Sequence, residues 1–75
     1  MTATKEHAEI LLIALKSASG TNLSIIGQGN CFKVTNENGR EMLGPDWMGA
    51  KELCDRIEGA LYFVQRGGDA SGAKV

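Results

Sequence analysis

Two glycine-containing turn signals divide the middle of this 75-residue chain. The first is the Gly-Gln-Gly-Asn stretch at residues 27–30, and the second is Asn38-Gly39, a pair that strongly favours a two-residue hairpin turn. Three strand-length stretches surround these signals: residues 23–26, 31–37 and 40–43. We therefore expect three antiparallel strands that form a meander.

The lengths of the two turns predict which side chains share a face of the sheet. A four-residue first turn pairs Ile26 with Cys31, and a two-residue second turn pairs Thr35 with Met42. One face then carries Leu23, Ile25, Phe32, Val34 and Leu43, and the other carries Ser24, Ile26, Cys31, Lys33, Thr35 and Met42. A strongly apolar face and a mixed face are typical of a sheet that is packed on one side only.

Helical periodicity precedes and follows this sheet. Residues 3–18 form the first predicted helix, with Thr2 or Thr4 as N-cap and Gly20 at its end. Its apolar stripe consists of Ala8, Leu11, Leu12, Leu15 and Ala18. The second helix follows Pro45, with Asp46 as N-cap, and its stripe consists of Trp47, Ala50, Leu53, Cys54, Ile57, Ala60, Leu61 and Val64.

The element order α-β-β-β-α predicts an α+β fold. We expect a two-layer sandwich in which two helices cover one face of a three-stranded antiparallel meander. Residues 1–65 form a single domain in this interpretation. Residues 66–75 are rich in small polar residues without periodicity, so we expect a disordered C-terminal tail.

Composition excludes several classes of protein. The formal net charge of −1 argues against strong non-specific attraction to phosphate backbones or anionic membranes. No apolar run is long enough for a membrane span. Acidic residues precede the first apolar run, where a signal peptide would carry basic ones, and the two cysteines have no metal-site or disulfide-framework spacing. These features predict a cytoplasmic protein.

Catalytic motifs are incomplete. Residues 25–34 resemble the G-x-G-x-x-G-x-V phosphate loop of protein kinases, with Phe32 in place of the third glycine. A kinase also needs a strand lysine and two aspartates on a second lobe, for which this chain has no room, so we interpret the stretch as a turn. His7 is the only histidine, and no acid/base pair or metal set can be assembled around it. We expect no enzyme activity, no catalytic or metal-binding residues and no cofactor.

The element order is similar to that of the double-stranded RNA-binding domain, and this likeness covers most of the chain as topology alone. That family carries a basic K-K-x-A-K signature at the start of its last helix. The matching residues 47–51 agree with it only at Ala50 and Lys51, and Asp46 lies beside them. The small toxin ribonucleases that share this fold use a histidine on a strand, whereas His7 lies on a helix. The resemblance therefore implies the fold, and neither function is carried over.

Exposed apolar groups favour a protein-interaction module instead. The predicted partner-binding surface on the sheet consists of Ile26, Cys31, Lys33, Thr35, Arg40 and Met42. The predicted dimer or partner interface on the helices consists of Ile10, Ile13, Tyr62 and Phe63. The first strand also has an apolar edge without lysine or proline to protect it, which favours a homodimer.

Short, acidic α+β chains of this kind look like accessory proteins of bacteriophages and other mobile elements, which inhibit or adapt a host protein. We therefore expect a partner protein of unknown identity, most simply bound by a homodimer of this chain. The alternative is nucleic-acid or nucleotide binding on the open sheet face, with Lys33 and Arg40 supplying the charge.

Overall fold

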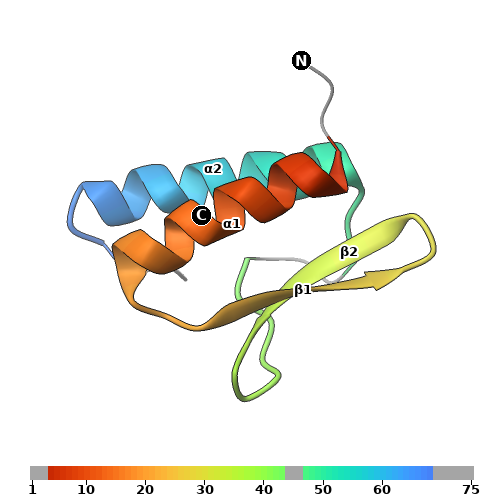
Figure 1. Ribbon diagram of the computed structural model, residues 1–75, viewed down its shortest axis with the longest axis horizontal. Coiled ribbons are helices and arrows are strands. Elements are labelled where there is room, and N and C mark those ends of the chain that lie inside the picture. Colours follow the sequence, from red (N-terminus) through yellow and green to blue (C-terminus); the bar gives the residue numbers. More distant parts are fainter. Residues whose placement is uncertain (1–3, 44–46, 69–75) are drawn as a thin grey trace.

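The computed structural model describes residues 4–43 and 47–68. It contains two helices, α1 (Lys5–Ser19) and α2 (Ala50–Gln65), and two antiparallel strands, β1 (Leu23–Gln28) and β2 (Cys31–Asn36). Figure 1 shows the helices side by side over one face of the hairpin, both running in the same direction. The predicted α+β class and the placement of both helices on one face are confirmed.

Helix α1 spans Lys5–Ser19 instead of residues 3–18, and its ends are Thr4, one of the two predicted N-caps, and the predicted Gly20. The Thr4 hydroxyl accepts a hydrogen bond from the His7 N–H at 3.1 Å, so Thr4 is the N-cap. Gly20 takes a left-handed conformation with φ of 73°, and its N–H donates to the Lys16 carbonyl at 2.9 Å. Both ends of α1 are therefore determined by local hydrogen bonds.

The core lies between the helices and the inner face of the hairpin. The buried apolar residues are Ala8, Leu12, Leu15, Leu23, Val34, Leu43, Met48, Leu53, Cys54, Ile57 and Ala60. Most belong to the two predicted helical stripes, but Ala18 is exposed and Leu11 is only half-buried. Met48 was not among the predicted core residues. The N-terminal ends of the helices lie close together, and the Cys54 thiol donates to the Thr4 carbonyl at 3.6 Å.

The first turn is shorter than predicted. Gln28 pairs with Cys31, so only Gly29 and Asn30 connect the strands, and Ile26 pairs with Lys33 instead of Cys31. Gly29 has φ of 62°, as the first central residue of a type II′ turn requires. The ring of Phe32 lies across from Gly27, where an added Cβ would come within 3.3 Å of it. The register slips by two residues, so every side chain keeps its predicted face.

The second turn is longer than predicted. The pairing after it shifts by one residue, which changes the face of the sheet on which Met42 lies. Thr35 pairs with Glu41 instead of Met42, which leaves three residues in the loop and places Gly39 in a left-handed conformation with φ of 78°. The Asn36 side chain accepts from the Asn38 and Arg40 N–H groups at 2.9 and 3.0 Å and so supports this loop. A slip of one residue reverses the faces, so Met42 packs against the core.

The predicted third strand is not confirmed in the described residues. Beyond the loop, the chain pairs with β2 at a single position, through Asn36 N–H to Arg40 O at 2.9 Å and Met42 N–H to Val34 O at 3.0 Å. The chain bends at Leu43, which is buried. Met48 then pairs with Phe32 through two main-chain bonds of 2.7 and 2.8 Å. Two short contacts thus occupy the outer edge of β2.

The predicted start of the second helix is wrong. Because Met48 is engaged in main-chain pairing with Phe32, it is not helical, and α2 begins at Ala50 with Gly49 as its N-cap. The predicted N-cap, Asp46, lies outside the described residues. Most of the predicted tail, residues 69–75, does as well. Residues 66–68 turn back on the end of α2, where the Gly68 N–H donates to the Phe63 carbonyl at 3.0 Å.

Truncating Ile57 by one methyl group should lower the free energy of unfolding by about 0.5–1.5 kcal/mol, because its side chain is fully buried. The measurement is urea denaturation of Ile57→Val. The matched control is Ile26→Val, the same chemical change at an exposed position of β1, which should stay within about 0.5 kcal/mol of the wild type. Equal losses in the two variants would contradict the described core.

Candidate functional site

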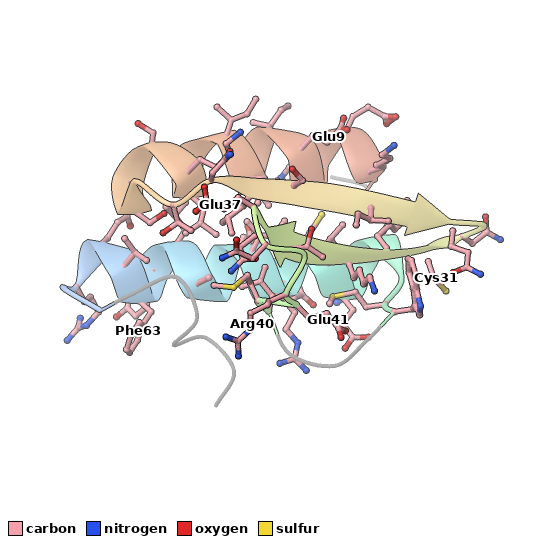
Figure 2. All side chains as sticks on the ribbon, turned by 90° about the horizontal axis from the view of Figure 1, so that it is seen from below. Glu9, Cys31, Glu37, Arg40, Glu41 and Phe63 are labelled. Atoms are coloured by element: carbon pink, nitrogen blue, oxygen red, sulfur yellow. The ribbon has the colours of Figure 1, made fainter. Side chains whose placement is uncertain are left out.

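The structure brings three of the predicted sheet-face residues together. Ile26 and Lys33 are direct cross-strand partners on the face away from the helices, and Ile26 is 42% exposed. Cys31 is exposed next to the turn, at one end of the hairpin (Figure 2). The Lys33 ammonium lies 4.7 Å from the centre of the Trp47 ring, so this face carries a cation–π contact that the sequence interpretation missed.

The other three predicted sheet-face residues do not extend this surface. Thr35 is only 4% exposed because it lies between paired neighbours, Ser24 on one side and Glu41 on the other. Met42 is half-buried and packs against the core after the register slip. Arg40 is exposed on the loop that follows β2, beside Glu41 in Figure 2. The predicted surface was therefore too large.

The predicted helix residues lie on two separate surfaces. Ile10 and Ile13 are 65% and 67% exposed on α1, on the side opposite its buried residues. On α2, the Tyr62 hydroxyl accepts from the Arg66 guanidinium at 3.0 Å, and that guanidinium also lies 5.3 Å from the Tyr62 ring centre. The Phe63 ring occupies the space that a Cβ on Gly68 would need, so it packs on the turn after α2.

The outer edge of β1 has no strand partner among the described residues. On β2, both main-chain groups of Phe32, the C=O of Val34 and the N–H of Asn36 point away from β1, since they bond to Met48, Met42 and Arg40. Main-chain groups alternate in direction along an antiparallel pair. Leu23, Ile25 and Gly27 oppose those three residues, so their N–H and C=O groups point toward the outer edge of β1.

A groove lies between this edge and α1. It has a volume of about 300 Å³ and is open to solvent, and it is lined by Glu9, Leu12, Ile13, Lys16 and Ile25. Figure 2 shows α1 along the outer side of β1, with Glu9 near the end of the strand. Only Ile13 of these residues was predicted as an interface residue. The signal available in the sequence was the pair of charges that flank the apolar stripe of α1 on one side.

The described residues hold no group of three His, Cys, Asp or Glu side chains placed to bind a metal ion. His7 is half-buried, and its Nδ1 has no hydrogen-bond partner among the described residues. None of the helices in the described part of the chain is long and apolar enough to cross a membrane. The open edge of β1 and the groove beside it bring outward main-chain groups and apolar side chains together.

Cys31 should react quickly with a thiol reagent in the folded protein, whereas Cys54 should react only on unfolding. Burial raises the pKa of the Cys54 thiol, and the nearby carboxylates of Glu58 and Asp55 raise it further. Because the folded pKa is the higher one, the stability that Cys54 contributes is complete below the unfolded pKa and is lost as pH rises beyond about 9. Titration with Ellman's reagent, with Cys31→Ser as control, measures the two rates; two equally fast thiols would contradict the assignment.

No protein-family model, curated protein or solved structure matches this chain.

Proposed function

We propose that this protein is a non-catalytic protein-interaction module that binds an extended segment of a partner along the outer edge of β1. The observation that carries the proposal is the position of the groove directly beside a strand edge that has no strand partner in residues 4–43 and 47–68. An added strand would bond to the outward groups of Leu23, Ile25 and Gly27. Its alternate side chains would enter the groove against Leu12, Ile13 and Ile25.

Strand addition divides affinity and specificity between two parts of the site. Main-chain hydrogen bonds along the edge supply affinity without regard to sequence, and the groove selects side chains. An apolar strand edge without protecting charges promotes aggregation when no partner covers it. The sequence of β1, Leu-Ser-Ile-Ile-Gly-Gln, contains no charge and no proline, so a bound segment would also protect this edge from aggregation.

Binding of this kind suits an inhibitor or an adaptor. By holding a segment of a host protein in extended form, the chain would block that segment or recruit it without performing chemistry. This is the mode of action that we propose for an accessory protein of a bacteriophage or another mobile element. A groove of about 300 Å³ that is open to solvent also suits protruding side chains better than an enclosed small molecule.

We further propose a homodimer through the exposed side of α1. Ile10 and Ile13 are the most exposed of the large apolar residues among those described, and they lie one turn apart on the same side of the helix. The edge of β1 is less suited to self-pairing, because α1 runs along its outer side and a second copy would bring a second α1 into the same space (Figure 2). A helix-to-helix dimer leaves the outward main-chain groups of β1 available for a partner, and Ile13, which also lines the groove, lies where the dimer interface and the groove meet.

Nucleic-acid binding is the alternative, and the described charges favour it less. Lys51 and Arg56 form ion pairs with Asp55 and Glu52 at 3.1 and 3.6 Å. These α2 cations are therefore partly neutralised by carboxylates one turn away. Binding to phosphates should weaken steeply as salt rises, whereas main-chain pairing at β1 should not, so salt dependence separates the two functions.

Blocking one outward N–H of β1 should abolish partner binding without unfolding the protein. The chain can be made by chemical ligation at Cys31, with N-methylated Ile25 in the first fragment. The N–H of Ile25 points away from β2, so the sheet stays intact while a bound strand loses a hydrogen bond and meets a methyl group. We expect at least a roughly tenfold loss of affinity for a peptide selected by the wild type from a random library.

N-methylated Ile26 is the matched control, because its N–H faces β2. That variant should instead lose about 1–3 kcal/mol of folding stability. Circular dichroism during heating measures stability, and fluorescence anisotropy measures peptide binding. Undiminished binding by the folded protein with N-methylated Ile25 would contradict strand addition at this edge.

The dimer proposal predicts a sedimenting mass of about twice the 8.0 kDa of one chain at micromolar concentration. Placing carboxylates at Ile10 and Ile13, in an Ile10→Glu/Ile13→Glu double variant, should return the mass to that of a single chain. Tyr62→Glu, an equally exposed site on α2, should leave the dimer intact. A wild-type mass that stays at 8.0 kDa would remove the dimer from the account.

A further inference from the structure

The groove carries opposite charges at its two ends. Glu9 and Lys16 both line it, with Leu12 and Ile13 between them on α1 and Ile25 across from them on β1. Neither the Glu9 carboxylate nor the Lys16 ammonium has an ion-pair or hydrogen-bond partner among the described residues. Because α1 and β1 run in opposite directions in Figure 1, Glu9 lies toward the end of β1 and Lys16 toward its start. An occupant therefore meets a carboxylate, an apolar floor and an ammonium in that order.

The distance between these charges matches the repeat of a strand. Glu9 and Lys16 are seven positions apart on α1, which corresponds to a rise of about 10.5 Å along the helix. In an extended chain, side chains at positions p, p+2 and p+4 lie on one face, and the outer two are about 13 Å apart. Flexible charged side chains at p and p+4 can therefore reach Glu9 and Lys16 while the side chain at p+2 contacts the apolar floor.

Resting on the β1-edge binding proposed above, we infer that the groove selects an extended peptide segment with one basic and one acidic residue four positions apart and an apolar residue midway between them. The basic residue lies at Glu9 and the acidic residue at Lys16. A segment that runs antiparallel to β1 carries the basic residue first, and one that runs parallel carries it last. The two groove charges thus determine the direction in which a partner strand docks.

Selection from a random library of peptides of about ten residues, which leaves room for a strand of typical length, tests this inference. The wild type should enrich opposite charges four positions apart around an apolar residue. Glu9→Lys makes both ends of the groove basic and should enrich acidic residues at both positions. Lys16→Glu makes both ends acidic and should enrich basic residues at both positions.

Glu6→Lys is the matched control for Glu9→Lys. It changes the net charge by the same amount, but Glu6 does not line the groove, and helical spacing places it beside Ile10, which does not line the groove either. This variant should select the wild-type pattern. On synthetic peptides, each mismatch between a groove charge and a peptide charge should lower the affinity roughly fivefold at low salt.

The outcomes separate this inference from the function on which it rests. If N-methylated Ile25 loses peptide binding but all three charge variants select the same sequences, strand addition stands and charge selection is wrong. If the wild type enriches no peptide, both fail. Inverted patterns in the two groove variants, with an unchanged pattern in Glu6→Lys, support charge selection.

Discussion

The main-chain bonds on the outer side of β2 determine which edge of this small sheet is open. Phe32 exchanges two bonds with Met48, and Val34 and Asn36 each bond to the segment at residues 40–42. The outward main-chain groups of β2 therefore bond to other segments of the same chain. Since β2 bonds to β1 on its other side, β1 is left as the one long edge without a strand partner among the described residues. The candidate site follows from that asymmetry.

Helix α1 gives the open edge its chemical character. Its buried side, with Ala8, Leu12 and Leu15, packs into the core, and the neighbouring side overhangs β1 with Glu9 and Lys16. The helix is held by its Thr4 cap at one end and by Gly20 at the other. A strand added at β1 would meet side chains that a capped helix holds in place, so the groove can be selective even though Glu9 is exposed and Lys16 is only half-buried.

Prediction from sequence succeeded where the periodicity of apolar residues was sufficient to identify an element and its buried face. The helical stripes located both helices, and the alternation along residues 23–28 and 31–36 placed Ile26 and Lys33 on the open face despite the wrong first turn, because a slip by two residues preserves faces. It failed for Met42, whose face depends on one residue of turn length, and for Thr35, which is buried because β2 is paired on both sides at that position. Neither the pairing of Met48 nor the groove was predicted, since both depend on tertiary contacts between segments distant in sequence.

The most direct test of the central claim is amide hydrogen exchange along β1, with and without a bound peptide. In the free protein the Ile25 amide should exchange quickly, whereas Ser24 and Ile26, which face β2, should be protected. On peptide binding the Ile25 amide should slow markedly and its two neighbours should change little. An Ile25 amide that is already protected in the free protein, or that does not slow on binding, would contradict the account.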